Sequence, residues 1–392
     1  MGSDAAASLS ASGRADAAAS PDGASAGHRA DAGARTCFVA RGPIELPIRS
    51  PIALAVHGDA IDAVMNEDGR PRIVTRPAGP APLAPVPAGR ETVDGPKAAG
   101  YGVPCAVAGE HIFCPDRAGA VRRTNRAGAE EHVVASARTS TRIAAGALDA
   151  HHVALVYLAS RQTSEGWVSE AWMAVDDEAP RRISEDGSGA TALAVTPRGR
   201  GLLVLMVDAR TALTALHVRP VSFADRPVLG EDSVIFVGGP GDRRTRAALA
   251  VPPAGAGFSF LPIARDIGTF GLAVVRVDDP AKVDEPMAWT MYPNGLDPAP
   301  VAAAIATRGG ASTTWVALVR PRGPEVGSPR VLELGAVSPE GAFEPREELP
   351  TDGNVSDVAL AADASGALWV AWVDAGGTWL ERLACGLKAR AG

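Results

Sequence analysis

Residues 358–373 read VALAADASGALWVAWV, two apolar runs on either side of a short polar turn. Each run has the length of one β-strand, and Asp, Ser and Gly between them are the residue types that tight turns favour. The stretch therefore predicts a β-hairpin whose first strand is rich in alanine and whose second strand carries tryptophan. The same form recurs along the chain, and this recurrence decides the fold.

Seven segments share the form and start 40 to 56 residues apart. They are residues 53–65, 104–114, 144–158, 192–207, 248–263, 302–319 and 358–373. A third and a fourth apolar run follow the better copies, which then end on a Gly-containing turn such as Asp186-Gly187 or Asp352-Gly353. A period of about 50 residues suits units of four strands with their turns.

Small and large residues are divided between the two strands of each copy. Alanine dominates the first strand, whereas Trp315, Trp369, Trp372, Phe258 and Phe260 belong to the second. Small side chains suit strands that crowd around an axis, and large ones suit the wider space between neighbouring sheets. The order indicates a radial arrangement, because a linear solenoid would not require it.

The two ends of the repeat array complement each other. The seventh copy ends after a third strand at residues 378–385, and residues 36–48 form an extra strand before the first copy. Pairing these segments would complete the last unit and remove an exposed sheet edge. We therefore predict an all-β fold, a seven-bladed β-propeller closed by pairing an N-terminal strand with the last blade.

The turn Asp363-Ala-Ser-Gly-Ala-Leu-Trp369 resembles the Asp-x-x-Gly-x-x-Trp turn of sialidase-type propellers, in which the Asp caps the turn. The match is clean in one blade only, since residues 196–199 and 307–310 occupy the same turn without the Asp. Enzymes of that family use an arginine cluster with a Tyr and Glu pair. Here Tyr157 lies in an apolar strand and Tyr292 has no recognisable Glu beside it, so the resemblance does not extend to activity.

The chain divides into a tether and one domain by composition. Residues 1–35 are rich in Ala, Ser and Gly, with too little apolar surface to fold, and residues 36–388 form the expected single propeller domain. The Met-Gly-Ser opening resembles a start that replaces a removed export signal. Mature lipoproteins often begin with such a linker, which leaves lipid anchoring open.

The four cysteines form two informative pairs. Cys105 and Cys114 flank a hairpin that turns at Gly109-Glu110, while Cys37 and Cys385 lie at the two ends that the closed ring would bring together. Two disulfides would indicate an oxidising compartment: the periplasm, the outer-membrane surface or the medium. Four buried free thiols are the alternative. No Cys-x-x-Cys spacing supports zinc.

Charge and motifs exclude several classes of function. A net charge of −7 without a basic stripe argues against nucleic acid, and no apolar run is long enough for a transmembrane segment. We expect no cofactor and no metal site. The histidines, acidic runs and basic pairs are predicted to be surface groups or groups with satisfied contacts, and Gly187-Ser188-Gly189 is predicted to be a turn between blades. They are His57, His111, His132, His151, His152 and His217, Asp176-Asp177-Glu178 and Asp278-Asp279, and Arg122-Arg123, Arg181-Arg182 and Arg243-Arg244.

Two hypotheses about function follow. The first is an exported, monomeric, non-catalytic propeller that binds a protein or a cell-envelope polymer through its loops. The second is a polysaccharide-active hydrolase or lyase whose acid and base come from loops of different blades. Two carboxylates in a central groove would favour the enzyme.

Overall fold

The structure is a computed structural model of the chain. It describes residues 37–79, 91–92, 98–99, 103–128, 132–135, 139–149, 151–164, 166–208, 215–223, 226–238, 246–253, 255–265, 269–279, 283–284, 288–290, 300–322, 329–353 and 355–385. Outside these ranges lie the predicted tether, Tyr292 and the basic pair Arg243-Arg244. Among the described residues no helix is long and apolar enough to cross a membrane.

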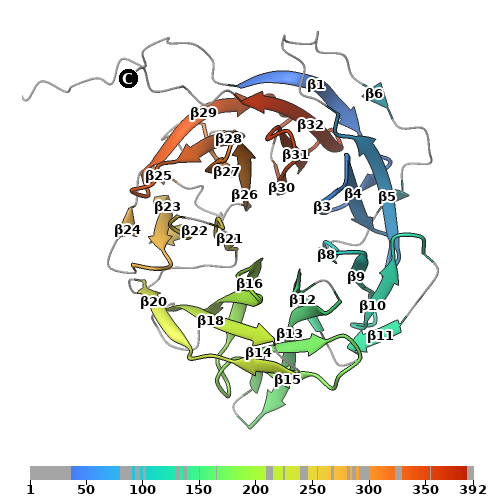
Figure 1. The fold of residues 1–392 in the computed structure, drawn as a ribbon, viewed down its shortest axis with the longest axis vertical. Helices are drawn as coiled ribbons and strands as arrows, with labels where there is room; N and C mark the ends of the chain where they lie inside the picture. Colours follow the sequence, from blue (N-terminus) through green and yellow to red (C-terminus); the bar gives the residue numbers. More distant parts are fainter. Residues whose placement is uncertain are drawn as a thin grey trace, which may run out of the picture. The chain divides into compact units, whose positions relative to one another are not determined.

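Seven small antiparallel sheets form a seven-bladed β-propeller, as the repeat predicted (Figure 1). Blade 1 contains β3 (Ile52–His57), β4 (Ala60–Asn66) and β5 (Pro71–Pro77). Blade 2 contains β8 (Ala106–Ala108), β9 (His111–Pro115), β10 (Val121–Asn125) and β11 (His132–Ala135). Blade 3 contains β12 (Thr139–Ala147), β13 (Val153–Thr163), β14 (Gly166–Val175) and β15 (Arg181–Arg182). Blade 4 contains β16 (Ala190–Pro197), β17 (Gly201–Asp208), β18 (Ala215–Phe223), β19 (Pro227–Leu229) and β20 (Ser233–Val237).

Blade 5 contains β21 (Ala248–Ala250), β22 (Phe258–Arg265), β23 (Thr269–Arg276), β24 (Val283–Asp284) and β25 (Ala288–Thr290). Blade 6 contains β26 (Val301–Arg308), β27 (Ala311–Pro321), β28 (Arg330–Val337) and β29 (Phe343–Leu349). Blade 7 contains β30 (Asp357–Ala362), β31 (Leu368–Val373), β32 (Thr378–Cys385), β1 (Cys37–Glu45) and β6 (Glu91–Thr92). A separate short pair joins β2 (Ile48–Arg49) to β7 (Ala98–Ala99).

All seven hairpins expected from the repeat are the first and second strands of the seven blades. The alanine-rich first strands surround the centre of the ring (Figure 1), and the five aromatic side chains on the second strands are buried as predicted. The fourth position departs from the simple pattern. Blades 4 and 5 each divide it between two short strands, and the part of blade 1 that the structure describes has three strands.

The N-terminal strand closes the ring. Strand β1 pairs antiparallel with β32, with Cys37 opposite Cys385, so blade 7 contains both ends of the repeat array. A disulfide joins these cysteines, and a second joins Cys105 to Cys114 across the β8–β9 hairpin. Both predicted pairs are present, and no cysteine in the described chain is free.

The turn at Asp363 is held by its own carboxylate. Oδ1 accepts hydrogen bonds from the backbone N–H groups of Ser365 and Ala367 at 2.9 and 3.1 Å. Oδ2 accepts from Trp369 Nε1 at 3.0 Å and from Arg382 Nη2 at 2.8 Å. Gly366 adopts φ +76°, which glycine reaches without strain. One buried carboxylate thereby joins the turn, the second strand and the third strand of blade 7.

Candidate functional site

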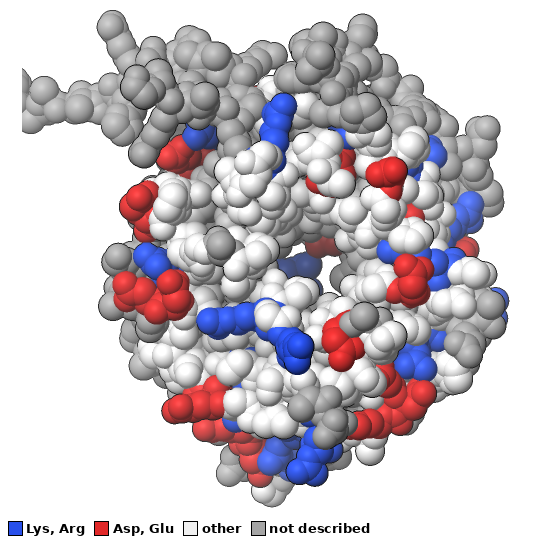
Figure 2. Space-filling view, viewed as in Figure 1, with Lys and Arg blue, Asp and Glu red and all other residues white. Residues whose placement is uncertain are grey.

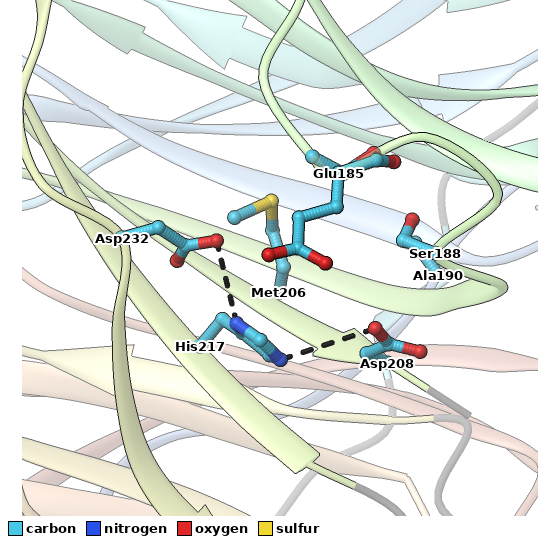
Figure 3. A pocket seen from close by; sticks show the side chains of 8 residues that line it. Glu185, Ser188, Ala190, Met206, Asp208, His217 and Asp232 are labelled. Carbon is cyan, nitrogen blue, oxygen red and sulfur yellow. Dashed lines mark hydrogen bonds and ion pairs between the residues drawn. The ribbon is translucent and has the colours of Figure 1, made fainter. Parts of the chain in front are cut away.

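A small pocket lies at the boundary between blade 3 and blade 4 (Figure 3). It is formed by the connection between the blades and by the adjoining ends of β16, β17 and β18. Its cavity of about 10 Å³ has room for roughly one water molecule. We call it the His217 pocket. Its lining residues are Ser184, Glu185, Ser188, Ala190, Met206, Asp208, His217 and Asp232.

Carboxylates flank the imidazole of His217 on two sides (Figure 3). Nδ1 lies 3.4 Å from Asp232 Oδ2, and Nε2 lies 3.9 Å from Asp208 Oδ2. The interaction with Asp232 raises the pKa of His217 most, burial opposes this, and the charges of Asp208 and Glu185 add to the increase. The imidazole is therefore stabilised in its charged form, with each ring nitrogen facing a carboxylate.

The loop that covers the pocket is fixed from blade 3 by a buried glutamate. Glu170 is fully buried and accepts hydrogen bonds from Arg161 Nη2 and from the backbone N–H of Gly187, both at 2.9 Å. Arg161 also pairs with Asp186 of the same loop. Burial alone would raise the pKa of Glu170, but the hydrogen bonds from Arg161 and Gly187 outweigh it and lower it to about 2. Glu170 is thus a permanent anion that anchors the connection between the blades.

The start of the same loop is attached to both blades. The backbone N–H of Ala171 donates to Ser184 Oγ at 3.1 Å, and Ile183 N donates to Ala171 O at 2.8 Å. From blade 4, the Arg219 guanidinium donates to the carbonyl of Ile183. Because the loop is bound on both sides, the pocket has a defined geometry before any ligand arrives.

Two polar atoms at the pocket have no hydrogen-bond partner. Ser188 is 3% exposed and its Oγ is unpaired, and Oδ1 of Asp232 is likewise buried without a partner. A buried polar atom without a partner costs free energy, about 1–3 kcal/mol for a neutral group. Polar atoms of this kind at a cavity indicate a site for a hydrogen-bonding occupant.

The remaining candidates from the sequence are engaged in structural contacts. Tyr157 is buried in the core, and burial raises its pKa to about 12. His57 lies beside Glu110, and His152 Nδ1 lies 2.6 Å from Asp176 Oδ2. Within the described chain, no group of three or more His, Cys, Asp or Glu residues could hold a metal ion.

Several residues of the acidic and basic runs form ion pairs, whereas the sequence predicted solvated turns and strand edges. Arg123, expected at a strand edge for solubility, is 8% exposed and donates to Asp177 of blade 3 at 2.7 Å. Arg122 pairs with Asp116, and Arg182 with Glu170. Figure 2 shows Arg side chains interspersed with Asp and Glu around a central opening, on the face in view.

From the sequence, His217 was predicted to be an isolated histidine and Ser188 to be part of a turn between blades. In the structure both residues line the same pocket. The register explains why. Met206 pairs with His217 and Asp208 with Ala215, which brings Asp208 towards the imidazole across neighbouring strands. The signal in the sequence was an acidic residue near the end of a strand on either side of His217, namely Asp208 and Asp232. It indicates a pocket only when the strand pairing is known.

No family model matches the chain, and no curated protein is similar to it. Among solved structures, YCF48 bound to D1 peptide is 12% identical, with a TM-score of 0.46 over 88% of this chain and 95% of that one. Kuenenia stuttgartiensis Hydrazine Synthase is 11% identical, with a TM-score of 0.49 over 86% and 96%. SapL1 lectin in complex with alpha methyl fucoside is 12% identical, with a TM-score of 0.42 over 73% and 96%. Similarities at this level say nothing of ligand or activity.

Proposed function

We propose that the chain is an extracytoplasmic, non-catalytic binding module whose partner is a protein or a cell-envelope polymer. The observation that carries the proposal is the His217 pocket, a preformed acidic cavity with unpaired buried atoms on Ser188 and Asp232. Such a cavity suits a polar group supplied by a partner, because binding would satisfy atoms that folding leaves without hydrogen bonds.

The two disulfides support the compartment and the scaffold role. Disulfides persist mainly in oxidising compartments, which favours a location outside the cytoplasm. The bond between Cys37 and Cys385 also covalently closes the ring, so the loops between blades are carried by a rigid frame. Preorganised loops lose less conformational entropy when they bind a partner.

The state of His217 supports binding over catalysis. A general base must be neutral before it takes a proton, whereas the carboxylates of Asp232 and Asp208, 3.4 and 3.9 Å from the ring nitrogens of His217, favour its charged form. A charged imidazole donates from both ring nitrogens and has no free lone pair to accept a proton.

A polysaccharide-active hydrolase or lyase is the second candidate. It is favoured by one feature, the placement of Asp208 and Asp232 on either side of His217 in one pocket. Pairs of carboxylates carry out acid and base steps in glycoside cleavage. Here, however, the cavity is about the size of one water molecule, far smaller than a sugar ring.

One experiment separates the two candidates. The full chain is titrated against immobilised peptidoglycan fragments, envelope polysaccharides and envelope proteins by biolayer interferometry, and the same mixtures are assayed for new reducing ends and unsaturated sugars. We expect saturable binding without product. Product formation that is lost in Asp208→Asn and Asp232→Asn would support the enzyme instead.

A further inference from the structure

We propose that the His217 pocket binds a primary ammonium group carried on an aliphatic chain. This inference rests on the proposed binding function and names the chemical class that the pocket recognises.

The charge of the pocket calls for a cation. Glu185, Asp208 and Asp232 contribute three carboxylates to the lining, and His217 contributes at most one positive charge. The lining therefore keeps a net negative charge even with the imidazole protonated. An anion would meet repulsion here, while a cation would be attracted in a partly desolvated site.

The unpaired atoms require a donor. Oδ1 of Asp232 can only accept hydrogen bonds when the carboxylate is ionised, and Ser188 Oγ can accept through its lone pairs. An ammonium group has three N–H donors and no acceptor, so one group can satisfy both atoms. Hydrogen bonds from an ionised donor to a carboxylate are also roughly twice as strong as neutral ones.

Size separates ammonium from guanidinium. The cavity of about 10 Å³ accepts a group as small as one water molecule, and the ammonium head is a compact point charge. The planar guanidinium fork is larger and calls for a flat carboxylate surface. The cavity has room for the ammonium head alone, so the methylene groups behind the charge would extend out of it.

The test uses the full chain and n-butylammonium as the probe. The imidazole carbon-proton signal of His217, assigned by its absence in His217→Gln, is followed by NMR during titration. We expect a saturable shift with a dissociation constant in the millimolar range, and a much smaller shift with 1-butanol or n-butylguanidinium at the same concentrations. Nα-acetyl-lysine amide, glycinamide and glucosamine then distinguish a lysine side chain, an α-amine and an amino sugar as the source.

Two variants assign the binding to the pocket. Asp232→Asn should weaken butylammonium binding about tenfold or more, because it removes a charged acceptor. Ser188→Ala should weaken it by a few-fold and leaves every carboxylate in place, so it remains informative if Asp232→Asn perturbs the fold. Asp278→Asn, which removes an exposed carboxylate paired with Arg276 in blade 5, is the matched control and should bind like the unaltered chain.

Two outcomes would overturn the inference. Absence of a saturable shift with any amine would show that the cavity holds only water, and an equal response to 1-butanol would show unspecific apolar contact. If partner binding by interferometry persists unchanged in Asp232→Asn and Ser188→Ala, the binding module stands and only the ammonium site fails. If neither amines nor envelope partners bind, the proposed function itself fails.

Discussion

Cys37 and Cys385 lie opposite each other on β1 and β32 and are joined by a disulfide, although 348 residues separate them in the sequence. Their Cα atoms are 3.9 Å apart. The bond therefore links the first and the last strand of the ring and makes the closure of blade 7 covalent. Closure by strand pairing alone would depend on the hydrogen bonds between β1 and β32.

Removal of this disulfide should cost much more stability than removal of the second one. In the chain-entropy model, a loop of this length contributes at most about 6 kcal/mol, and the nine-residue separation of Cys105 and Cys114 gives about 2–3 kcal/mol. Urea unfolding of Cys37→Ala/Cys385→Ala and of Cys105→Ala/Cys114→Ala measures both terms. Equal losses would contradict the view that long-range closure dominates. Alkylation without reduction should find no reactive thiol in the unaltered chain.

Asp363→Ala should strongly destabilise blade 7. The Asp363 side chain is fully buried, and its loss would leave the Arg382 guanidinium, whose side chain is 7% exposed, without its ion-pair partner. Breaking a buried pair in this way costs about 3–5 kcal/mol. Ser365→Ala removes the hydrogen bond that Ser365 Oγ donates to Asp363 and the one that it accepts from Arg382 but keeps the ion pair, and it should cost about 1–2 kcal/mol. Tryptophan fluorescence during urea unfolding compares the two, and similar losses would show that the ion pair contributes little.

Glu381→Gln should stabilise the fold above neutral pH. Burial first, and then the charge of Glu347, raise the pKa of Glu381 from 4.5 to about 7, and its Oε2 has no partner. Between these values the folded chain holds a proton that the unfolded chain has released, so stability falls as pH rises from about 4.5 to 7. The difference corresponds to about 3 kcal/mol at pH 8.

The control for Glu381 is Glu347→Gln, which removes the neighbouring charge but keeps the buried carboxyl. Free energies of unfolding at pH 5.5 and pH 8 should show a large gain at pH 8 for Glu381→Gln and a smaller one for Glu347→Gln. A gain of the same size at both pH values would mean that the effect does not arise from the proton.

Much of the fold could be predicted from the sequence, because each repeat has small residues on its first strand and large residues on its second strand. Alanine on the inner strands and tryptophan on the second strands follow from crowding near the axis, and the unpaired ends follow from the need to cover sheet edges. The capped turn was recognised at Asp363 but missed at Asp374, which accepts from Gly376 N, Trp379 Nε1 and Trp372 Nε1. The sequence Asp-Ala-Gly-Gly-Thr-Trp at residues 374–379 could have indicated this second capped turn.

The site was not accessible in the same way. Ser188 is in the connection between the blades, Asp208 ends β17 and Asp232 precedes β20, so no short spacing joins these residues to His217. Their meeting depends on strand register and on the loop that Glu170 anchors from blade 3. Local patterns predict the blades, whereas a pocket between two blades depends on contacts that only the folded chain makes.

Deletion of residues 37–45 should prevent closure, whereas removal of residues 1–34 should leave stability unchanged. Strand β1 supplies Ile44 to the core and Cys37 to the disulfide, and its loss would expose the edge of β32. The truncation tests the proposal that the N-terminal segment is a tether. The midpoint temperature of thermal unfolding is measured for both variants. A decrease of several degrees after removal of residues 1–34 would show that this segment contributes to the fold.

Asp232→Asn should lower the pKa of His217. Asp232 contributes the largest effect that raises this pKa, ahead of the charges of Asp208 and Glu185, so its neutral isostere removes the main stabilisation of the imidazolium. A raised pKa in the folded chain means that this contribution to stability is complete below the pKa of the unfolded histidine, about 6.5, and is lost as pH rises through the folded value. NMR titration of the imidazole measures the change, with Asp278→Asn as a control that should titrate like the unaltered chain. A His217 pKa that is the same with and without the Asp232 charge would show that the imidazole is not held between carboxylates in solution, and the charge argument for the pocket would fail with it.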